Sequence, residues 1–64
     1  MDHTRKQLKQ AIIKRFRTLR LASVNLKINY YRVSHIVNGW IAPHSDEIKR
    51  IEKALGMSAK ELGL

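Results

Sequence analysis

The chain has no cysteine, a single proline and only three glycines among its 64 residues. Without cysteine, neither a disulfide framework nor a cysteine-based zinc site can form, and a cytoplasmic location is expected. No apolar run exceeds three residues, which is far too short for a signal-peptide core or a membrane span. The sequence therefore predicts one small soluble domain over residues 1–64, with no membrane partner.

Acidic residues are scarce as well, because five Asp and Glu stand against thirteen Lys and Arg, a net charge of +8. Residues 1–40 hold nine basic and one acidic side chain, whereas residues 41–64 hold four of each. Such a surplus on so small a body is typical of proteins that bind a polyanion, most simply the phosphates of nucleic acid. The alternative is a basic protein whose charge only keeps it in solution, and we favour nucleic acid.

Apolar periodicity predicts a compact all-α fold of five helices and no strands. The expected helices cover residues 4–16, 19–26, 30–38 and 45–55, and a last short one begins at residue 59. Thr18 and Asn29 are the expected caps of the second and third helices, and Ser58 has the capping-box spacing to Glu61. In the fourth helix, Ile48, Ile51 and Leu55 form the predicted buried stripe.

The third helix combines two kinds of face. Its apolar residues are spaced to form a buried stripe of Val33, Ile36 and Val37. Its outward positions hold planar, hydrogen-bonding side chains where a merely solvated helix would carry Glu and Lys, namely Tyr30, Tyr31, Arg32 and His35. This face looks suited to contact a ligand.

The order of helices resembles the lambda-repressor-like helix-turn-helix family, which includes phage Cro and repressor proteins. The resemblance covers residues 18–62 and is carried by Ile28, Val33, Ser34, Ile36, Asn38, Gly39, Pro43, Ile48, Ile51, Ala54, Leu55, Gly56, Ser58, Glu61 and Leu62. It implies a helix-turn-helix at about residues 18–38, whose second helix crosses the DNA backbone while the third enters the major groove.

Carried over by position, the resemblance assigns the base contacts to Tyr30, Tyr31, Arg32 and His35. The phosphate contacts map to Thr18, Leu19, Lys27, Asn38 and Trp40, and Arg17 and Arg20 are phosphate neighbours at the start of the second helix. The family often pairs through the end of the domain that here holds Trp40, Met57, Leu62 and Leu64. The implied function is a Cro-like phage or prophage repressor that binds a pseudopalindromic operator as a dimer, without a cofactor or small-molecule ligand.

Two departures from the family are informative. The usual glycine of the turn is Lys27, which costs about 1 kcal/mol if the backbone there takes a positive φ. A partly buried Arg–Glu pair of many members is replaced by Ile12 and Val37, which we expect to pack against each other.

Each site residue also has a plainer interpretation. Arg32 could clamp a phosphate instead of a base, and Trp40, which has one donor, fits the core or a subunit interface better than DNA. The basic residues Arg5, Lys6, Lys9, Lys14 and Arg15 would ordinarily form a solvated face.

Catalytic and metal-binding roles have little support in the sequence. His3, His35 and His44 lack the spacing of zinc ligands, and no nucleophile elbow, phosphate loop or carboxylate cluster occurs, so neither a metal site nor an enzyme is expected. Two non-enzymatic alternatives remain. One is an antitoxin-like or adaptor module that uses the same fold to bind a protein, and the other is a cationic membrane-surface helix over residues 4–20.

Overall fold

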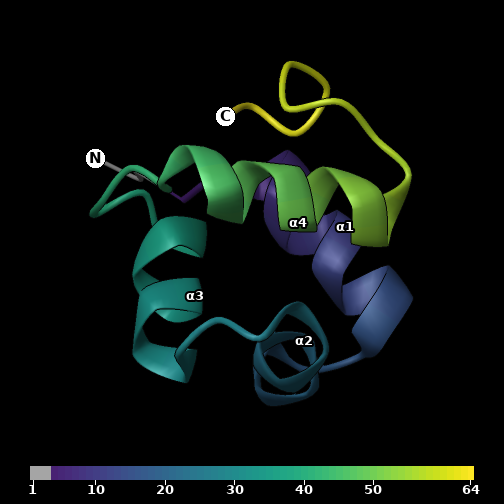
Figure 1. Cartoon of the computed structure of the whole chain (residues 1–64), viewed down its shortest axis with the longest axis vertical. Coiled ribbons are helices and arrows are strands. Elements are labelled where there is room, and N and C mark those ends of the chain that lie inside the picture. Colours follow the sequence, from purple (N-terminus) through teal and green to yellow (C-terminus); the bar gives the residue numbers. More distant parts are fainter. Residues whose placement is uncertain (1–3) are drawn as a thin grey trace.

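The computed structural model of the chain describes residues 4–64, which form four α-helices and no strand. The helices are α1 (Lys6–Phe16), α2 (Leu19–Leu26), α3 (Tyr30–Val37) and α4 (Ser45–Leu55). In Figure 1, α3 runs from beside α2 toward the loop that leads to α4. The all-α prediction is confirmed, whereas the prediction of five helices is wrong.

The start of α2 and of α3 follows the predicted capping residues. The Thr18 hydroxyl accepts a hydrogen bond from the backbone N–H of Leu21 at 3.1 Å, and Asn29 Oδ1 accepts one from Tyr31 N–H at 2.8 Å. Each bond satisfies a donor that the first turn of a helix leaves without a partner. Gly39, with φ +79°, ends the α3 segment as expected.

The segment after α4 contains the predicted cap but not the predicted helix. Ser58 and Glu61 form the reciprocal bonds of a capping box, since Ser58 N–H donates to Glu61 Oε1 and Glu61 N–H donates to Ser58 Oγ, both at 3.2 Å. Gly63 then adopts φ +75°, which stops the turn one residue after Leu62. A single turn fixes several dihedrals for few hydrogen bonds, so a cap alone does not make a helix.

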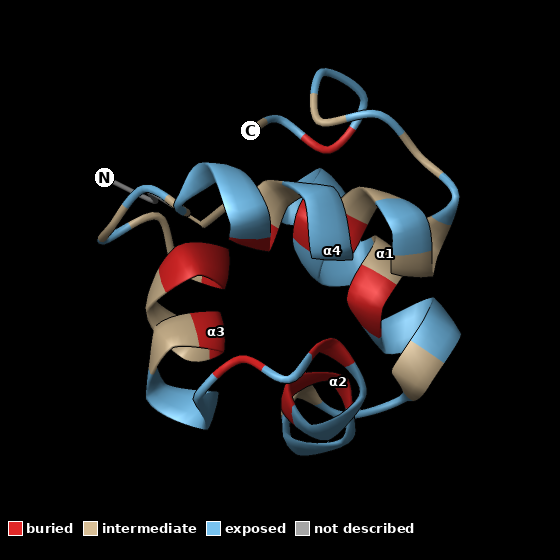
Figure 2. Cartoon of the chain, viewed as in Figure 1, coloured by how far each residue is buried: buried red, intermediate tan, exposed pale blue. Residues whose placement is uncertain are grey.

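The hydrophobic core takes residues from every helix, from the segment between α2 and α3, and from the segment after α4. It comprises Leu8, Ile12, Ala22, Leu26, Ile28, Val33, Ile36, Val37, Ile51 and Leu62. Figure 2 shows these buried positions facing the interior, with exposed positions on the outer sides of the helices. The predicted buried stripe of α3 is confirmed. Ile12 and Val37, which we expected to pack against each other, lie in the same buried cluster.

The predicted stripe of α4 is only partly right. Ile51 is buried, but Ile48 and Leu55 are half-buried, and the other buried residue of α4 is Glu47. Residues 47 and 51 are one turn apart on the same helix face, so the buried side of α4 is shifted toward Glu47 and includes a carboxylate that the apolar pattern did not indicate.

α1 and α2 each pack against all three other helices. No Cα atom of α3, by contrast, lies within 8 Å of a Cα atom of α4. The position of α3 relative to α4 is therefore set by side chains and by α1 and α2.

Within residues 4–64, two residues other than glycine have a positive φ. Arg17, with φ +76°, is the C-cap of α1, and Lys27, with φ +57°, is the left-handed C-cap of α2. A left-handed conformation brings Cβ close to the neighbouring carbonyl oxygen and costs an L-residue roughly 1–2 kcal/mol. Lys27, at the position where the family that the sequence resembles usually has a turn glycine, thus has a positive φ.

Lys27→Gly should therefore stabilise the protein, because glycine occupies the left-handed region without this penalty. We expect the free energy of unfolding to rise by about 1 kcal/mol, which raises Tm by roughly 4–8 °C in a domain of this size. Thermal unfolding followed by circular dichroism would measure it. Lys27→Ala is the matched control, since it removes the same charge but keeps Cβ; equal Tm values for the two variants would contradict the prediction.

Candidate nucleic-acid interface

The outward face of α3 is centred on Tyr31 and His35, which lie one helical turn apart. Tyr31 is 70% exposed and His35 is half-buried. Tyr30 is less exposed, at 39%, and meets Tyr31 edge to face with 5.8 Å between the ring centroids. The guanidinium of Arg20 lies 5.5 Å from the centre of the Tyr30 ring. Tyr31 is therefore the freer tyrosine, and Tyr30 joins α3 to α2.

Trp40 extends this face beyond the end of α3. Its indole lies 5.2 Å from the His35 ring, with an angle of 37° between the two planes, and its backbone N–H donates to the His35 carbonyl at 2.9 Å. The side chain is 67% exposed, so of the two interpretations preferred for Trp40, the core and a subunit interface, the core is wrong. Its apolar area packs on an imidazole at the surface instead.

Arg32 makes a bidentate ion pair with Glu47 of α4. Its Nε–H donates to Glu47 Oε2 and its Nη2–H donates to Oε1, each at 2.7 Å. Glu47 Oε1 also accepts the backbone N–H of His44 at 2.7 Å, and the residue is only 5% exposed. The Arg32 side chain keeps 35% of its surface exposed. The guanidinium is thus fixed on one edge and open to solvent elsewhere.

Hydrogen bonds to Glu47 decide its ionisation. The bond from Arg32 lowers the pKa of the Glu47 carboxyl to about 2, with a further contribution from the His44 N–H, against the opposing effect of burial. The same hydrogen bond raises the pKa of Arg32. Both groups are therefore charged at neutral pH. The apolar pattern of the sequence did not indicate this role, although Glu47 lies one turn before Ile51 and therefore on the same face of α4.

Five of the residues predicted to contact phosphates lie in or next to α2, whereas Asn38 and Trp40 follow α3. Arg17, Thr18, Arg20 and Lys27 are exposed, and Thr18 caps the helix. Leu19 packs against the core, so its backbone N–H is the group it can offer to an anion. Asn38 is half-buried, with Nδ2 at 3.4 Å from Ser34 Oγ.

Arg5 has a structural role that the basic pattern did not indicate. Its Nη1 donates to the carbonyl oxygens of Ile36, at 2.5 Å, and Ile41, at 2.9 Å, and its backbone N–H donates to Val37 at 2.8 Å. It therefore satisfies acceptors at the carboxyl end of α3, where a cation is also favoured by the helix dipole.

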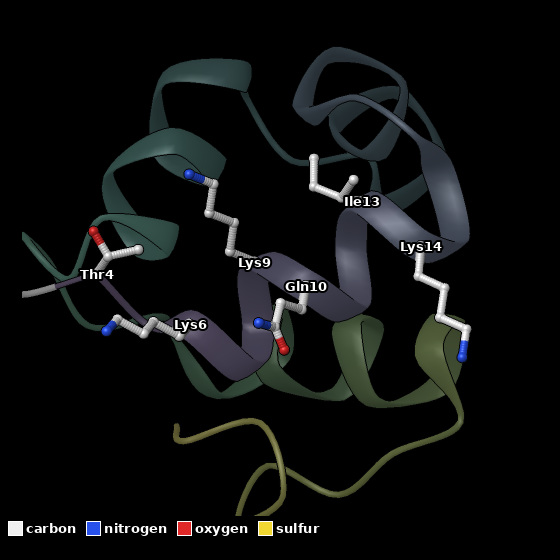
Figure 3. A pocket seen from close by; sticks show the side chains of 6 residues that line it. All are labelled: Thr4, Lys6, Lys9, Gln10, Ile13 and Lys14. Atoms are coloured by element: carbon white, nitrogen blue, oxygen red, sulfur yellow. The ribbon is translucent and has the colours of Figure 1, made fainter.

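α1 presents a separate basic surface. Lys6, Lys9 and Lys14 line a shallow groove together with Thr4, Gln10 and Ile13 (Figure 3). Lys9 and Ile13 project from the same side of the helix, and none of the lining residues is acidic. The groove carries positive charge over α1, outside the face of α3.

The predicted subunit interface is only partly available at the surface. Leu62 is fully buried within the chain and closes the core, so it offers no area to a partner. Met57 and Leu64 are half-buried and pack against the same core. Of the four predicted interface residues, Trp40 alone is largely exposed.

Comparison with protein-family models, curated proteins and solved structures finds no match to this chain. The helix-turn-helix assignment therefore stays a prediction, and function is inferred from the geometry above. Within residues 4–64, no three His, Asp or Glu side chains gather to hold a metal ion, and His3 lies outside this range. Every helix of the described part is too short and too polar to cross a membrane.

The ion pair predicts a defined dependence of stability on acid. The Glu47 pKa is about 2 in the folded protein against an ordinary 4.5, so its stabilisation is complete above about pH 4.5 and is lost as the pH falls toward 2. We expect wild-type protein to lose about 1–3 kcal/mol more over this window than Glu47→Gln, as measured by urea unfolding at several pH values. Glu61→Gln, which removes an exposed carboxylate, is the control and should keep the wild-type slope. Parallel losses in wild type and Glu47→Gln would refute the prediction.

Proposed function

We propose that this protein is a sequence-specific DNA-binding transcriptional regulator that reads duplex DNA with α3. The observation that carries the proposal is the outer face of α3 with exposed Tyr31 and half-buried His35, on a helix that packs against α2 and its exposed cations. Planar side chains that can donate, accept and stack are those that contact base edges, and cations beside them neutralise phosphates.

The proposed docking treats α2, the segment 27–29 and α3 as a helix-turn-helix. A helix with its side chains is about 10–12 Å across, which fits a major groove about 12 Å wide. With α3 in the groove, Tyr31 and His35 face the bases, and Trp40 lies near the sugar-phosphate wall at the carboxyl end of the helix.

Charge supports this docking. Arg17, Arg20 and Lys27 are exposed at the two ends of α2, where a helix that crosses the backbone meets phosphates. The amino end of α2 adds backbone N–H groups to them. Residues 1–40 hold a single acidic side chain, so almost nothing on this part of the chain repels DNA.

The proposed mechanism is repression by a symmetric dimer on a pseudopalindromic operator, as in Cro-like phage or prophage regulators. Half-sites would lie about one helical turn, roughly 34 Å, apart. An occupied operator excludes polymerase, which requires no ligand domain.

A second candidate is an adaptor that binds another protein. Leu21 and Val24 favour it, because they are 50% and 69% exposed on the outer face of α2. Apolar side chains on that face would suit a protein partner better than a phosphate backbone.

Selection of duplexes from a random pool tests the proposal. We expect a recovered palindrome, and an affinity that falls steeply as salt rises because bound cations release counterions. Trp40 is the only tryptophan and is exposed, so its fluorescence can report binding near the end of α3. No selected motif together with a flat salt response would exclude the regulator and favour the adaptor.

Substitutions should separate base readers from phosphate contacts. Tyr31→Ala and His35→Ala should relax preference at individual base pairs by about 5–100-fold, because a lost base contact is worth about 1–3 kcal/mol. Arg20→Ala should weaken binding to every sequence and reduce the salt slope by about one. Lys60→Ala, in the neutral carboxyl-terminal third, is the control and should change neither. Uniform losses in the Tyr31 and His35 variants would mean that they do not read bases.

A further inference from the structure

The Arg32 guanidinium has a free edge of defined orientation. Its Nε and one Nη2 hydrogen are used by Glu47, and among residues 4–64 no partner accepts from Nη1. A guanidinium carries five N–H groups in one plane, so the edge between Nη1 and Nη2 still has paired donors. Two parallel donors of this kind match the O6 and N7 acceptors of a guanine.

The group that holds Arg32 is itself firmly placed. Glu47 is 5% exposed, and Oε1 accepts both from Arg32 and from the His44 backbone. It belongs to α4, whose Cα atoms stay more than 8 Å from those of α3. The pair is therefore a direct link between the proposed reading helix and a helix that does not enter the groove.

Stability alone does not explain such a pair. A buried ion pair can often be replaced by well-packed apolar residues of similar volume at no loss of stability. Here the Arg32 side chain stays 35% exposed while Glu47 is buried. This arrangement suits a buried carboxylate that holds a surface side chain in one orientation. An unsupported arginine would sample many rotamers and would lose that freedom on binding.

We propose that Glu47 is a positioning residue that aims the free edge of Arg32 at one guanine of each half-site. The inference rests on the proposed function and decides between the two roles open to Arg32, base contact and phosphate clamp. Paired with Glu47, the guanidinium is locally neutral, so it adds little to sequence-independent attraction. Its contribution is confined to a base whose acceptors match the fixed edge.

The test compares wild type, Glu47→Gln, Arg32→Ala and the double variant on the selected duplex, its single-base variants and a random duplex. Wild type should discriminate at one G·C pair by about 5–100-fold. Glu47→Gln should lose most of that discrimination at this position only. Its affinity for random duplex should be equal or higher, with a salt slope steeper by about one, because Arg32 gains an uncompensated charge. The double variant should match Arg32→Ala, since Glu47 acts through Arg32.

A merely structural role of Glu47 would give a different result. Glu47→Gln would then weaken all sequences in proportion, or keep the wild-type base preference, and either outcome would overturn the inference while leaving the proposed function in place. If wild type itself binds every duplex equally with a steep salt slope, or binds none, the proposed function fails first. The wild-type data alone therefore show whether the proposed function fails, and the Glu47→Gln data then test the inference.

Arg32→Lys keeps the test decisive if Glu47→Gln does not fold. Lysine retains the positive charge against Glu47 but has no planar fork and cannot be held in a bidentate geometry. We expect a folded protein, shown by cooperative thermal unfolding, with discrimination at the same G·C pair reduced about tenfold or more. Full retention of that discrimination would overturn the inference.

Discussion

The eight-residue helix α3 is too short to be stable by itself, and it depends on contacts with the rest of the structure. Isolated helices of this length are marginal in water because nucleation costs more than a few hydrogen bonds return. Here Asn29 caps one end, Arg5 binds the carbonyls at the other, and Val33, Ile36 and Val37 are buried along one side. All three supports act from behind or from the ends. The opposite face of α3 makes none of these three stabilising contacts, and it can therefore hold Tyr31 and His35.

Acidic and basic side chains are likewise divided between contacts within the fold and the exposed surface. Among the described residues, every acidic side chain is engaged near the carboxyl-terminal third: Glu47 with Arg32, Asp46 with Arg50 at 3.7 Å, Glu52 with the Ala59 N–H at 2.7 Å, and Glu61 in the Ser58 cap. Their charges are used within the fold. Of the basic residues before position 41, Arg5 and Arg32 donate hydrogen bonds within the fold, while Arg17, Arg20 and Lys27 around α2 are exposed and Arg20 lies over the Tyr30 ring. Exposed positive charge is thus concentrated on α1 and around α2.

Local signals predicted local features well. Thr18 and Asn29 cap the helices they were expected to cap, because capping depends on a side chain and a backbone N–H two or three residues away. The buried stripe of α3 follows in the same way from its spacing. Ser58 shows the limit of such signals, since its cap forms while the helix behind it does not. A capping box satisfies the first donors but supplies none of the packing that makes a helix persist.

Features that join distant positions were beyond a single sequence. Nothing local relates Arg32 to Glu47, or Arg5 to the end of α3, because both depend on how the helices pack. The core and the surface were both open to Trp40 for a related reason: hydrophobicity favours burial, and the sequence does not show that the His35 ring lies beside Trp40 at the surface. The one usable hint was geometric, since Glu47 shares a helix face with buried Ile51 and a carboxylate on that face requires a cation.

Backbone strain adds an independent argument about α2. Both non-glycine residues with a positive φ, within the described part, are basic: Arg17 precedes Thr18, the N-cap of this helix, and Lys27 is its C-cap. Folding alone would favour glycine at either position, by about 1 kcal/mol each, in a domain whose whole stability is of the order of 5–15 kcal/mol. Arg17 and Lys27 keep long cationic side chains there, and both side chains are exposed. Backbone strain that folding does not require is commonly found at residues whose side chains have a function in binding or catalysis. In the proposed complex with DNA, each of these two cations would contact a phosphate near one end of α2, a role that fits their charge and does not depend on the face of α3.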